Sequence, residues 1–147
     1  MKVRDIMSQP AKTIHPFQTV EEAAEHMALH DVGALVVTDA DQVVGIVTDR
    51  DIVVRCLAQG LAAATTTVRR AMTSSPTVIE PDESVSEAGL TLTNLRVRRL
   101  PVVEAGRLVG MVSSDDIVRH SDNEDLILLM VRRVAPRRTR QTGAAAS

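Results

Sequence analysis

The sequence predicts an α+β fold in which one β-α-β-β-α unit occurs twice around a pseudo-twofold axis. The first observation is an internal repeat: a shift of 65 residues aligns 3–55 with 68–120 without a gap, and 18 of the 53 positions are identical. The second is that both copies alternate short apolar strands with apolar residues at helical spacing. The third is size, because a unit of about 55 residues buries too little surface to be stable alone. The two copies are therefore expected to pack around a shared core.

The elements are expected in the same order in each copy: an opening helix, a strand, a helix, two strands and a second helix. In the first copy they are predicted at Val3–Met7, Lys12–Ile14, from Val20, Leu35–Thr38, Val43–Val47 and from Asp49. In the second copy they are predicted at Val68–Met72, Thr77–Ile79, from Val85, Leu100–Val103, Leu108–Val112 and from Ser114. Thr19 and Ser84 directly precede the long helices and can cap them.

The organisation along the chain follows from the repeat and from changes in composition. Residues 1–58 are predicted as the first repeat and 68–121 as the second, joined by a linker rich in Gly, Ala and Thr at 59–67. A further helix is predicted over 122–134, where Asn123–Val134 follows Asp122. Because Pro136 stops that helix, residues 135–147 are predicted to be a disordered basic tail.

Composition excludes several classes of protein. Phe17 is the only aromatic residue, which argues against base-stacking platforms for single-stranded nucleic acid. Cys56 is the only cysteine, so neither an internal disulfide nor a cysteine metal cluster can form. The longest apolar run, Leu126–Val131, is far shorter than the roughly 20 residues of a membrane span, and no secretory signal is visible. We expect a cytoplasmic protein without membrane contact.

Charge is divided unevenly along the chain. Residues 1–130 carry 12 Lys/Arg and 19 Asp/Glu, a net charge of −7, whereas residues 131–147 carry five Arg and no acid. These arginines are expected to be solvated; the alternative is weak, salt-sensitive binding of nucleic acid. They are Arg132, Arg133, Arg137, Arg138 and Arg140.

The sharpest local motif occurs once in each repeat, as Gly45–Ile52 and Gly110–Ile117. In both, an apolar strand ends in a hydroxyl residue, and an aspartate follows three positions later. The simplest interpretation is a helix cap, in which hydroxyl and carboxylate bind free backbone N–H groups. The alternative is a ligand site, because a helix start attracts phosphate and a carboxylate can accept hydrogen bonds from a ribose diol.

The repeat, the element order, the two motifs and the Val97–Val103 stretch (Val-Arg-Arg-Leu-Pro-Val-Val) together resemble a CBS domain pair, or Bateman module. The sequences of the segments Asp31–Leu35 and Thr48–Val53 are similar to those of small stand-alone bacterial CBS pairs of the hypoxic-response-protein type. The resemblance covers about residues 3–120. It implies binding of AMP, ADP, ATP or S-adenosylmethionine in the clefts between repeats, and regulation rather than catalysis.

The resemblance also implies roles for individual residues. Thr48 and Ser113 would contact phosphate or ribose, and Asp51 and Asp116 would hold the ribose hydroxyls. The adenine would be walled by residues of the predicted strands: Thr13, Ile14, Val36, Val37, Val78, Ile79, Pro101 and Val102. No cofactor is required beyond the nucleotide, which would carry Mg²⁺ if it is ATP.

Basic residues make the two clefts unequal. Arg98 and Arg99 precede the Leu100 strand, where they are either solvated or face ligand phosphates; the first repeat has Gly33 and Ala34 there and offers Arg50 instead. We place Arg98 and Arg99 beside Ser113, so the Ser113/Asp116 cleft is expected to be the tighter nucleotide site.

Other features leave alternatives open. His26 and His30 are four residues apart on a predicted helix, but no convincing third ligand is nearby, so no metal site is expected. The apolar run Leu126–Val131 either packs on its own chain or forms a dimer surface, and the CBS resemblance implies a homodimer. The function expected is ligand sensing read by a protein partner of unknown identity. The alternatives are a ligand-free structural or stress-response dimer and a weak nucleic-acid binder.

Overall fold

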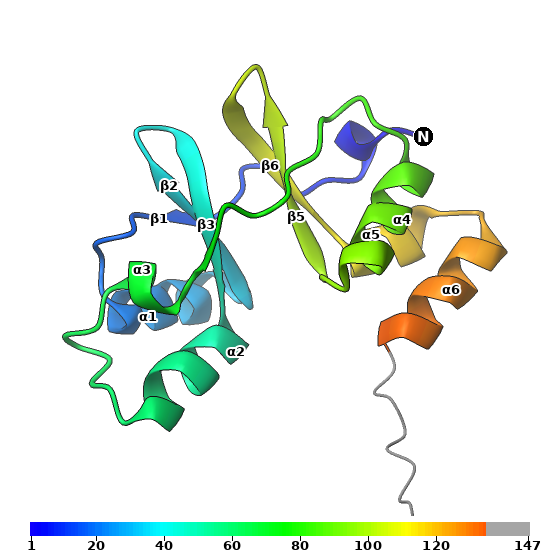
Figure 1. The fold of residues 1–147 in the computed structure, drawn as a ribbon. Coiled ribbons are helices and arrows are strands. Elements are labelled where there is room, and N and C mark those ends of the chain that lie inside the picture. The colour runs from blue at the N-terminus through cyan, green and yellow to red at the C-terminus, as the bar shows by residue number, and fades with distance from the viewer. Residues whose placement is uncertain (135–147) are drawn as a thin grey trace, which may run out of the picture.

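The computed structural model describes residues 1–134, so the predicted tail at residues 135–147 lies outside the described residues. Figure 1 shows two similar halves side by side, each with a small sheet and helices packed against it. This arrangement confirms the α+β class and the tandem repeat that the sequence predicts.

The first half has the predicted order of elements. They are the 3₁₀ turn η1 (Val3–Asp5), β1 (Thr13–Ile14), α1 (Val20–His30), β2 (Ala34–Asp39), β3 (Gln42–Thr48) and α2 (Asp49–Asp51). The chain continues from α2 as a π-helical segment, η2 (Ile52–Cys56), and a 3₁₀ turn, η3 (Leu57–Gln59). Helix α1 starts where predicted because Thr19 Oγ1 accepts a hydrogen bond from Glu22 N at 3.1 Å, and the Glu22 carboxylate accepts one from Thr19 N.

The second half repeats this order with one shorter element. It consists of α3 (Val68–Ala71), α4 (Val85–Leu95), β5 (Arg99–Glu104), β6 (Arg107–Ser113) and α5 (Ser114–His120), and α6 (Glu124–Val134) follows. The strand β4 (Thr73–Ser74) comes after α3 in the chain, but it pairs with β3 and belongs to the sheet of the first half. The predicted strand Thr77–Ile79 is reduced to an isolated parallel bridge between Ile79 and Val102. Ile79 is buried there, whereas Thr77 and Val78 stay exposed and outside the ladder.

Each opening helix packs into the opposite half. Val3 and Ile6 belong to the core under β5 and β6, and Val68 and Ala71 belong to the core under β2 and β3. The predicted linker at 59–67 is not a free connection, because Thr66 is buried and its carbonyl accepts a hydrogen bond from Val20 N at 2.8 Å. The two repeats are therefore consecutive in the sequence, but the opening helix of each repeat packs in the core of the other.

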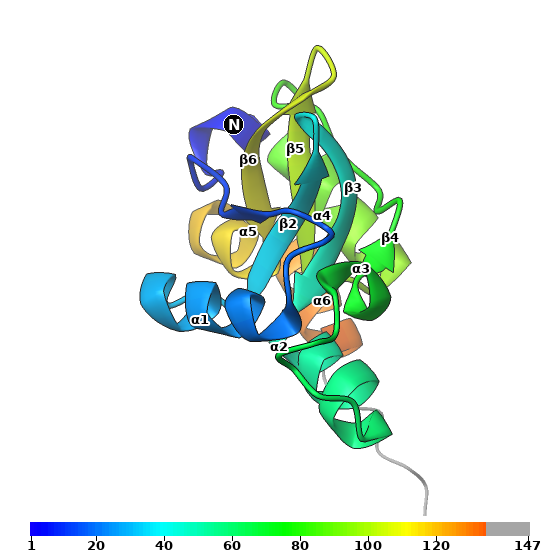
Figure 2. The same ribbon diagram turned by 90° about the vertical axis from the view of Figure 1, so that its left-hand side faces the viewer.

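The contacts that these opening segments make with the opposite half occur in pairs related by the 65-residue shift, as pseudo-twofold symmetry requires. Lys2 bridges Ser84 as Thr67 bridges Thr19, and Ser8 bridges Met111 as Thr73 pairs with Ile46. Figure 2 shows the β2–β3 hairpin crossing in front of β5 and β6, and β3 contacts β6 between the halves.

Two equivalent glycines allow this crossing. A Cβ on Gly45 would lie 2.5 Å from Met72 Sδ, and a Cβ on Gly110 would lie 2.7 Å from Met7 Sδ. In both places a backbone carbonyl lies at 2.9 Å from the added atom, so the chain could not simply move aside. The glycine shared by the two motifs is thus explained by packing of the crossing segment.

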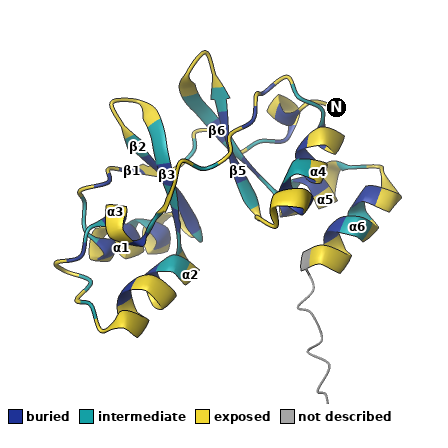
Figure 3. Ribbon diagram, viewed as in Figure 1, coloured by how far each residue is buried: buried dark blue, intermediate teal, exposed yellow. Residues whose placement is uncertain are grey.

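Helix α6 closes the core of the second half. It begins at Glu124, slightly later than predicted, because Asn123 Oδ1 accepts a hydrogen bond from Leu126 N at 3.0 Å and caps it. Leu126 and Met130 are buried against that core, while the opposite side of the helix stays exposed (Figure 3). The apolar run Leu126–Val131 therefore packs on its own chain through one face only. None of the helices in residues 1–134 is long and apolar enough to cross a membrane.

Candidate functional site: a cavity between the repeats

A cavity of about 550 Å³ lies between the two halves at the end of β3, within the size range of small-molecule sites. Three segments line it: the β3–α2 junction (residues 46–51), residues 73–77, which begin in β4, and residues 95–100, which connect α4 to β5. Its apolar wall consists of Ile46, Pro76, Leu95, Val97 and Leu100. Hydroxyl groups come from Thr48, Thr73, Ser75 and Thr77. The cavity therefore joins groups from both repeats.

Thr48 and Asp51 lie in this cavity and also form a helix cap. Thr48 Oγ1 accepts a hydrogen bond from Asp51 N at 3.1 Å, and Asp51 Oδ2 accepts one from Thr48 N at 2.9 Å. The other carboxylate oxygen, Oδ1, lies 4.0 Å from Arg55 Nε, and the Asp51 side chain is 17% exposed. The capping interpretation is confirmed, and Oδ1 is the oxygen left for a ligand.

Ser113 and Asp116 form the same cap in the second repeat. Asp116 Oδ2 accepts a hydrogen bond from Ser113 N at 2.8 Å, and Ser113 Oγ accepts one from Asp116 N at 3.1 Å. Ser113 Oγ also donates to Asp116 Oδ2 at 2.7 Å. Within residues 1–134 the Thr48 hydroxyl makes no equivalent bond to Asp51, so its proton remains for another acceptor.

The placement of the arginines corrects the sequence-based assignment. Arg99 does pair with Ser113 across the β5–β6 ladder, as expected from the sequence. However, Arg98 and Arg99 both line the cavity at Thr48 of the first repeat. A Cβ on Gly33 would lie 3.3 Å from Arg99 Nη2 and 3.2 Å from Asp49 Oδ2, so the guanidinium crosses to the first half.

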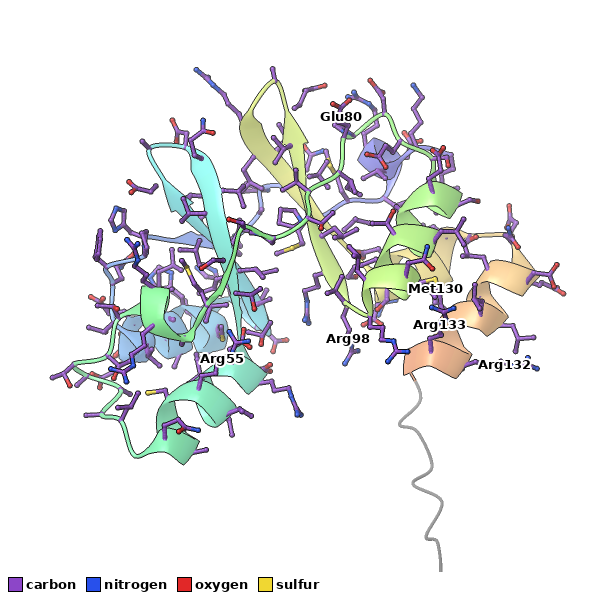
Figure 4. All side chains as sticks on the ribbon, in the orientation of Figure 1. Arg55, Glu80, Arg98, Met130, Arg132 and Arg133 are labelled. Carbon is purple, nitrogen blue, oxygen red and sulfur yellow. The ribbon has the colours of Figure 1, made fainter. Side chains whose placement is uncertain are left out.

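Arg98 lies at the edge of this cavity, near the foot of β5 (Figure 4). Its Nη2 is 4.0 Å from Asp115 Oδ1, and both side chains are more than half exposed. Such a distant, solvated ion pair is weak, so the Arg98 guanidinium is free to turn toward an anion.

The residues of the predicted adenine wall lie outside this cavity. None of the eight predicted strand residues lines the cavity, and six of them are buried. Ile14, Val37, Ile79 and Val102 point into the two helix-covered cores, because alternate strand residues face opposite sides. Val36 and Pro101 are also buried, and Thr13 and Val78 are exposed elsewhere.

Most of the apolar wall was not predicted from the sequence, although part of it was detectable. Gly45 and Val47 are buried on β3, so Ile46 and Thr48 share its other face. That alternation, applied to the motif, would have placed Ile46 beside Thr48. Nothing in the pattern indicated Leu95 or Val97, because their contribution depends on how the second repeat packs on the first.

The charges of the cavity favour an anion. Arg50, Arg98 and Arg99 outnumber Asp49 and Asp51, which gives a formal charge of +1. The residues 65 positions away carry two aspartates and no arginine, a formal charge of −2. They are Asp115, Gly33, Ala34, Ser114 and Asp116. The Thr48 cleft, rather than the Ser113 cleft, therefore has the composition of a phosphate site.

Other candidate residues do not assemble a site in the part of the chain that is described. The His26 and His30 rings lie edge to face with centroids 6.1 Å apart. Residues 1–134 contain no group of three or more His, Cys, Asp or Glu side chains arranged to hold a metal ion. Cys56 is buried, and its thiol contacts the Leu61 carbonyl oxygen at 3.6 Å.

Comparison with known proteins identifies the family. The family model described as "CBS domain" matches residues 3–57 and again 68–123. The chain belongs to the CBS-domain family. The two matches make a CBS pair, and CBS pairs are generally regulatory ligand-binding modules.

The CBS pair has relatives of similar length. It is 38% identical over 118 residues to hypoxic response protein 1 of Mycobacterium tuberculosis, covering 80% of this chain and 82% of that protein. A solved structure of hypoxic response protein I with two coordinated zinc ions is 36% identical, with a TM-score of 0.75, covering 82% of this chain and 99% of the other.

A second solved structure is informative about ligands. The CBS pair of MJ0100, in complex with 5′-methylthioadenosine and S-adenosyl-L-methionine, is 32% identical with a TM-score of 0.74. The match covers 81% of this CBS pair and 94% of that chain.

Proposed function

We propose that this CBS pair is a regulatory module that binds one adenine nucleotide in the cavity at Thr48 and transmits binding to a protein partner. One observation carries the proposal: Arg50, Arg98 and Arg99 converge from both repeats on the cavity that contains Asp51. Guanidinium groups bind phosphate, Asp51 Oδ1 can accept from a ribose hydroxyl, and the aliphatic wall suits a purine.

The charge balance favours nucleotides over S-adenosylmethionine. The MJ0100 pair binds adenosine-containing ligands, which supports the same class here. S-adenosylmethionine carries a positive sulfonium, whereas AMP, ADP and ATP carry phosphate that three arginines can neutralise. Mg²⁺ would accompany ATP, and no other cofactor is needed.

Binding would act on the packing of the two repeats. A phosphate held between Arg99 on β5 and Thr48 on β3 ties the halves together across their interface. A ligand with higher affinity for one relative arrangement shifts the population toward it, and a partner protein that contacts both halves detects that shift. The module regulates through this equilibrium and catalyses nothing.

A ligand-free structural dimer is the second candidate, and one observation favours it. Both motif aspartates already complete helix caps, so the fold explains them without a nucleotide. A homodimer is expected under either function; among similar structures, a CBS-CP12 protein from cyanobacteria is hexameric.

A thermal-shift series distinguishes the two. We expect AMP, ADP or ATP to raise the melting temperature more than S-adenosylmethionine or 5′-methylthioadenosine at equal concentration. A ligand at 100 times its Kd stabilises the folded state by about 2.7 kcal/mol. No shift with any adenosine compound would favour the structural dimer, and a larger shift with S-adenosylmethionine would overturn the anion argument.

A further inference from the structure

The three helices of the second half surround a groove beside the cavity at Thr48. Two adjoining cavities form it, of about 530 and 200 Å³, and both are lined by Arg98, Ser114 and Met130. Val118 and Val131 add aliphatic surface to the larger of the two. The groove between α4, α5 and α6 is therefore large enough to hold part of a bound molecule.

Four arginines reach this groove from four different segments. Arg96 follows α4, Arg98 precedes β5, Arg119 lies on α5 and Arg133 lies on α6, and all four are exposed. Figure 4 shows Arg98 and Arg133 on the same side of the second half. Among the described residues that line the groove, Asp115 is the only acid. The groove is thus strongly positive.

The fold itself does not require this positive charge. Asp31 ends α1 in the same left-handed conformation in which Arg96 ends α4, with φ of 51° and 56°. Val54 occupies the position equivalent to Arg119. Residues 1–130 carry a net charge of −7, so a cluster of arginines runs against the charge of the chain. Such a local excess of one sign attracts a partner of the opposite sign.

A buried hydroxyl group also lies in the groove. Ser114 is only 7% exposed and lines both cavities. Its backbone N–H donates to the Arg98 carbonyl at 2.9 Å, but within residues 1–134 its hydroxyl makes no hydrogen bond. Since no fully enclosed side-chain oxygen in those residues lacks a partner, the Ser114 oxygen opens into the groove. A carboxylate would accept the proton that this hydroxyl can donate.

We infer that the groove binds an acidic segment of a partner protein, with aliphatic residues between its carboxylates, and that this segment competes with the nucleotide for Arg98. The guanidinium groups would bind carboxylates through paired N–H donors, and the Ser114 hydroxyl would donate to one of them. The aliphatic lining would cover the apolar side chains of the segment.

The lining favours a peptide over a nucleic acid. Leu92, Val118 and Met130 offer contact to apolar side chains, which a sugar–phosphate backbone does not have. The described lining contains no aromatic ring on which a base could stack. The negative charge of residues 1–130 would also repel a polyanion that extends beyond the groove.

Arg98 connects the groove with the cavity at Thr48. Of the described residues it alone lines all three cavities, and its 61% exposed side chain is held by a 4.0 Å contact to Asp115. A guanidinium that turns toward a phosphate at Thr48 is lost to the groove, so the two ligands weaken each other by the same factor. This competition rests on the proposed function, whereas binding in the groove does not. It gives the partner a local way to detect the nucleotide.

A labelled peptide tests the groove without nucleotide. The probe is a short synthetic peptide of glutamates with isolated leucines, and its control has glutamine at every glutamate. Fluorescence anisotropy should show that the wild-type chain binds the acidic peptide at least about tenfold more tightly than the control.

Three variants locate the peptide. Arg119→Gln should weaken binding at least about tenfold, and Ser114→Ala, which changes no charge, at least about fivefold. Arg107→Gln is the matched control, because it removes the same charge from an exposed arginine at the tip of the β5–β6 hairpin. It should leave the Kd of the peptide unchanged.

AMP tests the competition. Saturating AMP should raise the Kd of the peptide at least about fivefold, and saturating peptide should raise the Kd of AMP by the same factor. Arg98→Gln should weaken both ligands and remove their coupling, whereas Arg119→Gln should leave AMP binding unchanged. AMP that binds without affecting the peptide would contradict the competition. A chain that binds the peptide but no AMP would contradict the proposed function and support the groove alone.

Three results would overturn the groove itself. The first is equal affinity for the acidic peptide and its control, or for the wild-type chain and both groove variants. The second is tighter binding of a single-stranded oligonucleotide than of the peptide. The third is an affinity for the peptide that falls as the chain is concentrated, because a second copy would then occupy the groove.

Discussion

The two repeats share a backbone and differ in the side chains that face their clefts. In both, a glycine admits the crossing segment, and a hydroxyl–aspartate pair caps the following helix. Around the Thr48 cap there are three arginines, while the equivalent positions around Ser113 carry none. The shared positions thus complete the crossing and the helix caps in both halves, and the positions that differ set the charge around each cap.

The anchors of the opening helices differ in the same way. Arg4 bonds to Asp82 at 3.0 Å and to Glu104 at 3.2 Å, whereas its equivalent, Arg69, lies over the Phe17 ring at 5.9 Å from the centroid. Phe17 and Asp82 are themselves equivalent positions. The opening helix is therefore anchored by ion pairs in one case and by a cation–π contact in the other.

The largest expected effects test whether the two cores are one folding unit. Leu35→Ala and Leu100→Ala each remove an equivalent, fully buried side chain and should destabilise the protein by about 2–5 kcal/mol. Because each opening helix belongs to the other core, both variants should unfold in one transition. Urea unfolding followed by circular dichroism checks this. Two separate transitions would show that the exchanged segments do not couple the halves.

A smaller effect on stability is expected from the helices that follow β3 and β6, which differ at Arg55 and its equivalent, His120. Arg55 Nη1 donates to the carbonyls of Ala71 and Met72 at 3.2 and 3.0 Å and fixes the crossing segment beside the cavity. Since its side chain is 46% exposed, Arg55→Ala should cost about 1 kcal/mol.

Within residues 1–134 the side-chain hydrogen bond of the equivalent residue, His120, is to the Asp116 carbonyl of its own helix, so His120→Ala should change stability by less than about 0.5 kcal/mol. Hydrogen exchange at β4 provides the second measurement. Faster exchange in the His120 variant than in the Arg55 variant would contradict the comparison.

The smallest effect concerns the two anchors and pH. Hydrogen bonds from Arg4 and then Lys2 hold the pKa of the Asp82 carboxyl below its ordinary value of 3.8. A lowered folded-state pKa gives stability that is fully present above that ordinary value and is lost as pH falls through the lowered one.

Asp82→Asn should therefore be slightly less stable than wild type at neutral pH and equal to it in acid. Phe17→Leu, at the other anchor, should show a difference that does not change with pH over this window. Thermal melts at several pH values measure both, and a pH-independent Asp82→Asn difference would contradict the ion-pair account.

Much of the fold could be predicted because the repeat is visible at the level of single residues. Matched positions such as Leu35 and Leu100 fixed the strands, and Thr19 and Thr48 fixed the helix starts through their caps. The exchange of Val3 and Val68 between cores could not be predicted. A repeat gives the order of elements in each copy, but it does not tell whether an opening helix packs in the core of its own copy or of the other.

The candidate site was predicted less completely. The motif residues Thr48 and Asp51 do line the cavity, because a strand ending at a helix start is a local arrangement. Arg98 and Arg99 were placed beside Ser113 from their position before the Leu100 strand, and for the Arg99 backbone this is correct, because Arg99 pairs with Ser113 across the β5–β6 ladder. A long guanidinium side chain reaches well beyond its ladder partner, so its destination depends on the packing of the second repeat.

The most direct test of the unequal clefts is calorimetric titration of AMP into the wild-type chain and three variants. Asp51→Ala and Asp116→Ala remove the same cap from equivalent helices, so each controls for the effect of the other on folding. The account predicts one AMP per chain, an affinity reduced at least about tenfold by Asp51→Ala and by Arg99→Ala, and near-wild-type affinity in Asp116→Ala. Two equal sites per chain, or a larger loss in Asp116→Ala than in Asp51→Ala, would contradict it.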